Sequence, residues 1–332
     1  MAGEIVAAGG YRTAVGGNIG TPAISLVESA TAETIAVLEV SSFQLETIET
    51  FRPQIAVVLN VTPDHLDRHR TFTAYTDAKA RIFENQRAED FAVLNADDLT
   101  CVELAARTRG QVFWFSRTRE VKQGAFVHDG RILFRDHSGQ TEVMLVSEIP
   151  LKGAHNVENV LAAVCVGALL RCQPEQIRKA VGNFKAVEHR LEYIATIGGV
   201  EYYNDSKATN VDATIKAIES FPANLHLILG GKDKGSDYSV LNDLLRQRVK
   251  RVYTIGAAAE KIESQIKGTA EIDHAVTLET AIKHATAAAK PGDIVLLAPA
   301  CASFDQFRNY EHRGKVFKQV IHALAQQELA AQ

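Results

Sequence analysis

The chain has 332 residues, of which 46% are hydrophobic and 23% charged, and its formal net charge is −4. At roughly 150 residues per domain this length predicts two domains, and the absence of a basic stripe argues against nucleic-acid binding. The lack of long apolar runs, of a signal-peptide pattern and of Cys-x-x-Cys spacing among the 4 cysteines predicts a reduced cytoplasmic protein with no membrane span and no structural zinc.

The first half of the chain alternates short apolar runs with helical segments. Runs that are β-branched and nearly continuous are typical of buried parallel strands. Expected strands lie in residues 11–15, 37–44, 55–61, 91–95 and 112–115, and expected helices in 3–10, 23–33, 72–86 and 99–108. Residues 124–146 differ, because Asp129-Gly130 between apolar runs indicates a hairpin. We therefore expect a parallel sheet followed by a small antiparallel annex.

The second half restarts the strand–helix alternation after two helices, at 157–171 and 174–184, and a linker at 185–190. We place the domain boundary there, which gives domains of residues 1–186 and 187–332. Expected strands of the second domain lie at 200–204, 225–229, 252–255 and 294–297, with a helix at 211–219. The predicted fold class is α/β, with two doubly wound domains of mainly parallel sheets.

Polar side chains follow the predicted strands of the first domain. Ligands bind beyond the carboxyl ends of parallel strands, and that edge would carry Glu39, Asn60, Asp64 and His65. A carboxylate and an imidazole on neighbouring strand ends could hold Mg²⁺, which favours oxygen ligands and substrate phosphates. Each residue taken alone is more often an ordinary part of a strand–loop junction, and it is their joint placement that favours a site.

Two other features carry the same ambiguity. Asn156 and Asn159 are three residues apart and so share one face near the start of a helix, where asparagine is either a cap or a nucleotide contact. Lys79 lies within the helix predicted for residues 72–86. From the sequence alone it is an exposed helical lysine.

Several motifs occur in one order along the chain, and together they are specific where each alone is weak. They are Gly17-Asn18-Ile19-Gly20 and the segments 39–46, 60–67, 155–159, 204–210 and 299–307. With these motifs the whole chain resembles the Mur ligase family. The Ser-Ser-Phe-Gln and Asp-Gln-Phe stretches are similar to those of the members that add D-glutamate. The Asp-Asn-Pro-Arg motif of the diamino-acid-adding members is absent.

The resemblance implies an ATP-dependent ligase of peptidoglycan synthesis, and hence of cell-wall growth, cell shape and cell division. It would phosphorylate the carboxylate of UDP-N-acetylmuramoyl-L-alanine and join the acyl phosphate to the amine of D-glutamate. Two Mg²⁺ ions are implied, with Glu39, His65 and a carbamylated Lys79 as metal ligands and catalytic groups. The resemblance further implies ATP contacts at Asn156, Asn159, Arg190 and Asp205. Substrate contacts are implied at Asn18, Ser41, Lys207, Thr209, Lys234, Ser303, Phe304 and Tyr310.

The chain departs from the family pattern in two respects. The family has an N-terminal domain that holds UDP and a Gly-x-x-Gly-Lys-[Ser/Thr] phosphate loop, and neither is found in this sequence. We therefore expect the central and C-terminal domains of a three-domain enzyme, monomeric, releasing little ADP by themselves. The alternatives are a non-catalytic fragment that binds only D-glutamate or nucleotide, and a related ligase such as folylpolyglutamate synthase. The Ser-Ser-Phe-Gln stretch argues against the latter.

Overall fold

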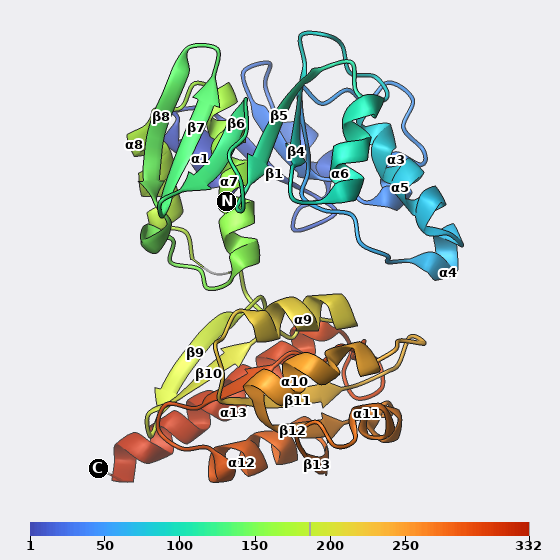
Figure 1. Cartoon of the computed structure of the whole chain (residues 1–332), viewed down its shortest axis with the longest axis vertical. Coiled ribbons are helices and arrows are strands. Elements are labelled where there is room, and N and C mark those ends of the chain that lie inside the picture. Colours follow the sequence, from blue (N-terminus) through green and yellow to red (C-terminus); the bar gives the residue numbers. More distant parts are fainter. Residues whose placement is uncertain (186, 332) are drawn as a thin grey trace. The chain divides into compact units, whose positions relative to one another are not determined.

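The computed structural model describes residues 1–185 and 187–331 and divides into two compact units (Figure 1). Unit 1 comprises residues 1–150 and 154–184, and unit 2 comprises residues 151–153 and the chain from 185 onward. The expected domain boundary falls at Ala186, which lies outside the described residues. In the described part of the chain, no helix combines the length and apolar character needed to cross a bilayer.

The described strands of unit 1 form two sheets. The smaller pairs β1 (Thr13–Gly17) with β2 (Ile35–Glu39) in parallel. The larger is six-stranded, in the order β3-β4-β5-β6-β7-β8. Its strands are β3 (Ile55–Val58), β4 (Phe91–Asn95), β5 (Gln111–Ser116), β6 (Gly124–His128), β7 (Arg131–Asp136) and β8 (Gly139–Leu145). Strands β3 to β6 are parallel and β6 to β8 antiparallel, so the antiparallel annex continues the parallel sheet.

Some expectations for unit 1 are wrong, among them a strand that continues to Gln44, since β2 ends at Glu39. The strand ending at Glu39 and the strand preceding His65 are not neighbours in one sheet, because β2 pairs along its whole length with β1, and β3 pairs with β4. The helix expected over 23–33 is reduced to one short helix and a 3₁₀ turn. Ile24 and Val27 are 78% and 65% exposed, so this segment lacks the buried apolar face that short helices need.

The largest hydrophobic core cluster of unit 1 is built on its longest helix, α7. Val160, Leu161 and Val164 of α7 are fully buried and pack with Ile5 of the first helix and Phe115 of β5. The helices are α1 (Ala2–Ala8), α2 (Ala23–Leu26), α3 (Ser42–Leu45), α4 (Leu66–His69), α5 (Phe72–Ala80), α6 (Leu99–Leu104), α7 (Ala154–Leu169) and α8 (Pro174–Gly182), with 3₁₀ turns η1 (Val27–Ser29), η2 (Arg81–Phe83), η3 (Ala105–Arg107) and η4 (Val146–Glu148).

Unit 2 is built on one six-stranded sheet in the order β13-β12-β11-β14-β10-β9. Its strands are β9 (Glu192–Ile197), β10 (Val200–Asn204), β11 (Leu225–Gly230), β12 (Val249–Ile255), β13 (Glu271–Val276) and β14 (Ile294–Leu297). All neighbours are parallel except β9 and β10. The sequence analysis did not foresee the two edge strands, β9 and β13.

Helices cover both faces of this sheet, as a doubly wound fold requires. Successive strand residues point to opposite faces: Leu227 and Leu229 of β11 enter one core cluster, and Ile228 enters another. The helices are α9 (Val211–Glu219), α10 (Asn242–Arg248), α11 (Ala259–Ile266), α12 (Leu278–Ala288) and α13 (Tyr310–Ala331), with the 3₁₀ turn η5 (Ser239–Leu241). The loops that leave the carboxyl ends of β10, β11 and β14 carry most of the residues predicted to bind substrate.

Candidate functional site

The two predicted residues nearest the N-terminus, Asn18 and Glu39, are in contact in unit 1. Glu39 ends β2 opposite Gly17 of β1. Gly17 has a φ of 108°, and a Cβ there would lie 2.3 Å from the Glu39 carbonyl oxygen, so glycine is required for this approach. Asn18 then donates from its backbone N–H to the Glu39 carbonyl at 2.8 Å and from Nδ2 to Oε1 at 3.1 Å. The Glu39 side chain is thereby oriented while remaining exposed.

Ser41 begins α3 directly after this strand end. Its Oγ accepts from the Gln44 backbone N–H at 3.2 Å, and the Gln44 side chain accepts from the Ser41 backbone N–H at 2.9 Å. This reciprocal capping box explains why β2 stops at Glu39 rather than continuing to Gln44. The predicted substrate contact is thus also a helix cap.

His65 caps α4 in a left-handed conformation, with a φ of 52°. Its side chain is 47% exposed, and its Nε2 lies 3.8 Å from Asp64 Oδ2. The ring meets Phe43 of α3 edge-on, with the centroids 5.1 Å apart. The His65 imidazole is therefore held in place yet open to a ligand.

His69, which the sequence analysis did not single out, ties these segments together. Its side chain is 2% exposed, with Nε2 3.0 Å from Ser42 Oγ and Nδ1 3.4 Å from Glu46 Oε1. The ring stacks on Phe43 at 5.3 Å. Because both ring nitrogens are engaged, His69 fixes α3 against α4. The available signal was the second histidine in the segment that follows β3.

Lys79 lies in the last turn of α5, with its Nζ 5.0 Å from the centre of the Tyr75 ring. Burial lowers the pKa of Lys79, and this lowering is opposed by Asp64, then Cys101, then Glu39. The negative charges of the Asp64 and Glu39 carboxylates therefore act on the Lys79 ammonium. A lowered pKa also increases the fraction of neutral amine, the form that reacts with CO₂.

The donors of unit 1 suit a metal that takes part of its coordination shell from a substrate. Among the described residues, no group of three or more His, Cys, Asp or Glu side chains could hold a metal ion. Glu39 and His65 offer single exposed donors. Mg²⁺ is commonly bound by one or two carboxylates plus substrate phosphates and water, so this donor set fits Mg²⁺ only in company with phosphate.

Asn156 and Asn159 lie in the first turns of α7. Asn159 Nδ2 donates to Asn156 Oδ1 at 3.3 Å, so the two side chains share a face, as their spacing predicted. Both are half-buried. Amide groups at a helix N-terminus suit an anionic or nucleotide ligand, and this role stays a prediction.

In unit 2 the structure brings Asp205, Lys207 and Ser303 to one edge of the sheet. They follow β10 and β14, which are parallel neighbours. Two backbone hydrogen bonds join the loops, from Asp205 N–H to the Leu297 carbonyl at 2.8 Å and from Ala300 N–H to the Ala208 carbonyl at 2.9 Å. Residues about 100 positions apart therefore meet because parallel strands end on the same side.

Asp205 is 8% exposed. Burial raises its pKa to about 7, against the smaller effects of the Leu191 backbone N–H and the Arg190 charge, which lower it. The charge of the exposed Arg190 thus acts on the Asp205 carboxyl group within unit 2. A carboxylate held so far out of water is typical of a functional site.

The remaining predicted residues of unit 2 surround this edge. Lys207 Nζ lies 5.5 Å from the ring centre of Tyr310, the first residue of α13. Ser303 is 2% exposed, whereas Phe304 is 67% exposed. Thr209 is half-buried beside Lys207, to whose carbonyl its backbone N–H donates at 2.8 Å. Lys234 lies exposed in the loop after β11.

Arg313 of α13 is a residue that the sequence analysis missed. It is 0% exposed and donates to the Ser206 carbonyl at 2.8 Å, to Ser206 Oγ at 3.0 Å and to the Cys301 carbonyl at 3.2 Å. Burial lowers the pKa of Arg313 to about 10. The guanidinium thus ties the loop after β10 to the loop after β14. Nothing in the local sequence distinguishes it from a surface arginine of an amphipathic helix.

His189 was also missed. It is 2% exposed, its Nδ1 lies 2.9 Å from Asn204 Nδ2, and its Nε2 has no hydrogen-bond partner in the described part of the chain. Burial lowers the pKa of His189. Nε2 lies 3.8 Å from Glu188 Oε1, which is too far for a hydrogen bond. This buried nitrogen, next to Arg190 in sequence, makes His189 a candidate ligand contact.

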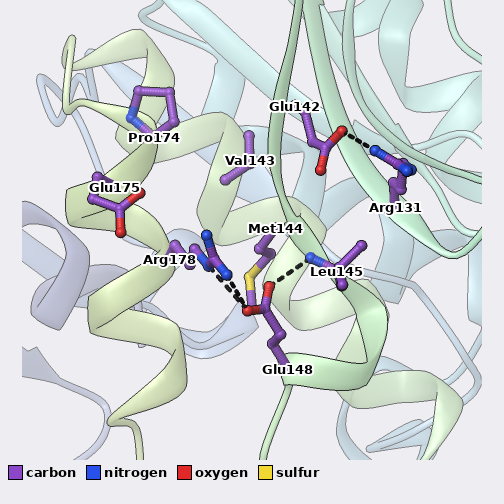
Figure 2. Close-up of a pocket in the computed structure, with 9 residues that line it drawn as sticks. All are labelled: Arg131, Glu142, Val143, Met144, Leu145, Glu148, Pro174, Glu175 and Arg178. Carbon is purple, nitrogen blue, oxygen red and sulfur yellow. Dashed lines mark hydrogen bonds and ion pairs between the residues drawn. The ribbon is translucent and has the colours of Figure 1, made fainter.

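A pocket of unit 1 holds none of the predicted residues. It lies between β8 and α8, and its walls carry Arg178 paired with Glu148 and Arg131 paired with Glu142 (Figure 2). These ion pairs neutralise both arginines, whereas Glu175, which also lines the pocket, is exposed and makes no ion pair in the described part of the chain.

Comparison with known proteins gives the family. Residues 3–167 match the Mur ligase middle domain and residues 189–301 the glutamate ligase domain of Mur ligases. A UDP-N-acetylmuramoylalanine--D-glutamate ligase of Koribacter versatilis is 66% identical over 328 residues, which are 99% of this chain and 72% of that protein. Its namesake from Acidobacterium capsulatum is 58% identical over 97% of this chain and 70% of its own length.

Solved structures agree on the fold. A pseudomurein peptide ligase type C from Methanothermus fervidus superposes with a TM-score of 0.73 at 16% identity, over 97% of this chain and 75% of that one. The MurF ligase of Thermotoga maritima in complex with ADP gives a TM-score of 0.71 at 18% identity, over 97% of this chain and 77% of that one. On the matched domains and the high identity to the curated relatives, this chain belongs to the Mur ligase family.

Proposed function

We propose that the chain forms the catalytic and amino-acid-binding parts of an ATP-dependent ligase that joins D-glutamate to UDP-N-acetylmuramoyl-L-alanine in peptidoglycan synthesis. The observation that carries the proposal is the 66% identity, over 99% of the chain, to a relative of that name. The grouping of Asp205, Lys207 and Ser303 at one sheet edge supports it.

The chemistry requires an activated carboxylate, because a free carboxylate is a poor electrophile. Phosphoryl transfer from ATP makes an acyl phosphate, the amine of D-glutamate attacks its carbonyl carbon, and phosphate leaves from the tetrahedral intermediate. Glu39, His65 and Lys79 as its carbamate would hold two Mg²⁺ ions. When bound, these ions would neutralise charge on the phosphates. The lowered pKa of Lys79 supports its conversion to a carbamate.

The nucleotide contacts proposed for unit 1 are Asn156 and Asn159, and those for unit 2 are Arg190 and Asp205. A guanidinium suits a phosphate, since its N–H groups match phosphate oxygens in pairs. The buried Asp205 would accept hydrogen bonds from hydroxyl groups of the nucleotide.

The amino-acid site proposed for unit 2 would recognise the two carboxylates of D-glutamate. Lys207 and Lys234 supply positive charge, and Thr209 and Ser303 supply hydroxyl donors. The aromatic side chains Phe304 and Tyr310 would border this site. In unit 1, Asn18 and Ser41 would contact the nucleotide-sugar substrate.

The proposal is tested by incubating the chain with ATP, Mg²⁺, D-glutamate and UDP-N-acetylmuramoyl-L-alanine and following the amide product by mass spectrometry. We expect product with D-glutamate, formed far more slowly than the ~10 s⁻¹ typical of enzymes, because these 332 residues contain no Gly-Lys-[Ser/Thr] phosphate loop. Omitting D-glutamate is the control. No product after prolonged incubation at high protein concentration would support the non-catalytic alternative instead.

A further inference from the structure

The loop that follows β11, residues 231–238, places Asp233 between Lys232 and Lys234 in sequence. Both lysines are exposed, and in the described part of the chain neither has a salt-bridge partner. Asp233 is fully engaged elsewhere. Its Oδ1 accepts from Tyr238 Oη at 2.8 Å and from the Ser236 backbone N–H at 3.1 Å. Its Oδ2 accepts from Lys261 Nζ at 2.7 Å.

Lys261 reaches this loop from α11 and is anchored there. Its Nζ lies 5.5 Å from the centre of the Tyr238 ring, a cation–π distance. Tyr238 is 0% exposed, and its hydroxyl lies 3.0 Å from Cys301 Sγ in the loop after β14. The Asp233–Lys261 pair is thus part of a packed connection between two loops of the proposed amino-acid site.

The arrangement decides which cation the Asp233 carboxylate neutralises. Oδ1 already has two donors, whereas Oδ2 has Lys261 as its one donor in the part of the chain that the structure describes. Without Lys261, Oδ2 would be open to the ammonium of either lysine that adjoins Asp233 in sequence, and of these two Lys234 is the predicted substrate contact. An ammonium paired with an internal carboxylate is less available to a substrate carboxylate, because binding would first have to break the pair.

We propose that Lys261 is a positioning residue that occupies Asp233 and so leaves Lys234 uncommitted for the anionic amino-acid substrate. The inference rests on the proposed function only for the identity of that substrate. The competition between Lys261 and Lys234 for one carboxylate is a property of the loop itself.

The competition can be measured without any ligand, by competitive acetylation of surface amines with acetic anhydride and mass spectrometry of the Lys234 peptide. Lys261→Met keeps aliphatic packing over Tyr238 but removes the charge. We expect Lys234 to react about fivefold more slowly in this variant, the upper range for an exposed ion pair. Adding Asp233→Asn should restore its reactivity. Lys283→Met is the matched control, since it replaces an exposed lysine of α12 that makes no ion pair with any described residue.

D-Glutamate binding by the same variants gives the functional consequence, with weaker binding in Lys261→Met and recovery in the double variant. Unchanged Lys234 reactivity in Lys261→Met would overturn the inference, as would a decrease that Asp233→Asn does not reverse. If the reactivities follow the expected pattern but the unsubstituted chain binds no D-glutamate, the role of Lys261 stands and the proposed substrate is wrong.

Discussion

Replacing Asp205 by asparagine is expected to stabilise the protein, because ionising this carboxylate costs more free energy in the folded protein than in the unfolded chain. Asp205 is 8% exposed, and burial raises its pKa to about 7 in spite of the Leu191 backbone N–H and the Arg190 charge. Asparagine retains an acceptor for the Leu191 N–H and carries no charge. The substitution should also weaken nucleotide binding if Asp205 has the proposed role.

The magnitude follows from the two pKa values. The carboxyl group changes from an ordinary 3.8 in the unfolded chain to about 7 in the folded protein, and each pKa unit corresponds to about 1.4 kcal/mol. The contribution of Asp205 is most favourable below pH 3.8 and declines as the pH rises to about 7. Asp205→Asn should therefore gain about 4 kcal/mol over the unsubstituted protein at pH 8, and little at pH 4.

The assay is urea unfolding of both proteins between pH 4 and pH 8.5, followed by circular dichroism, with a separate transition fitted for each unit. Asp293→Asn is the matched control in unit 2. Burial alone would raise the pKa of Asp293, but Lys250, the Lys290 backbone N–H and His226 together lower it. Asp293→Asn should therefore lower the free energy of unfolding at pH 8, and by a smaller amount in acid. Equal stability of Asp205→Asn and the unsubstituted protein across this range would refute the reasoning.

Three further substitutions test other parts of the account. Lys79→Ala should remove any ligase turnover, with partial rescue by short carboxylic acids. It should also remove the carbamate ¹³C signal that the unsubstituted protein gives with labelled bicarbonate and Mg²⁺. Full activity of this variant would rule out a role for Lys79 as a carbamylated metal ligand. His69→Phe should lower the free energy of unfolding by about 1–3 kcal/mol because the Ser42 hydroxyl loses its buried partner, and adding Ser42→Ala should recover much of the loss in urea titrations; no recovery would contradict this. Arg313→Met should cost at least about 2 kcal/mol by leaving the Ser206 and Cys301 carbonyls unpaired, and Arg313→Lys, with fewer donors, should recover only part of it; full recovery would contradict the need for a guanidinium.

In unit 2 the central strands could be predicted from the sequence, and the two edge strands could not. β14 is a continuous apolar run and β11 is one interrupted by His226, and their residues are almost all buried. This is the pattern of a sheet covered on both faces. β9 and β13 mix polar with apolar residues, and each has a single buried position, Ile197 in β9 and Ala275 in β13, so their hydrophobic signal is weak. Strand order was not readable either, because β10 pairs with β14 rather than with its successor in sequence.

For the candidate site, motif positions were predictable and supporting contacts were not. Asp205, Lys207 and Ser303 each follow an apolar strand, so their location at strand ends could be inferred. The partners that hold their loops, Arg313 and Tyr238, depend on tertiary packing of segments far apart in the chain. In unit 1 the charge of the Glu39 carboxylate acts on the pKa of Lys79. The strands expected to bring the metal ligands together nevertheless belong to separate sheets.

The most direct test of the central claim is titration of the chain with D-glutamate and L-glutamate, followed by calorimetry or ligand-observed NMR. The account predicts binding of D-glutamate in preference to L-glutamate. D-Glutamate binding should be lost in Lys207→Ala and should be unchanged in Lys283→Met. Equal binding of the two enantiomers, or binding of D-glutamate that survives Lys207→Ala unchanged, would contradict it.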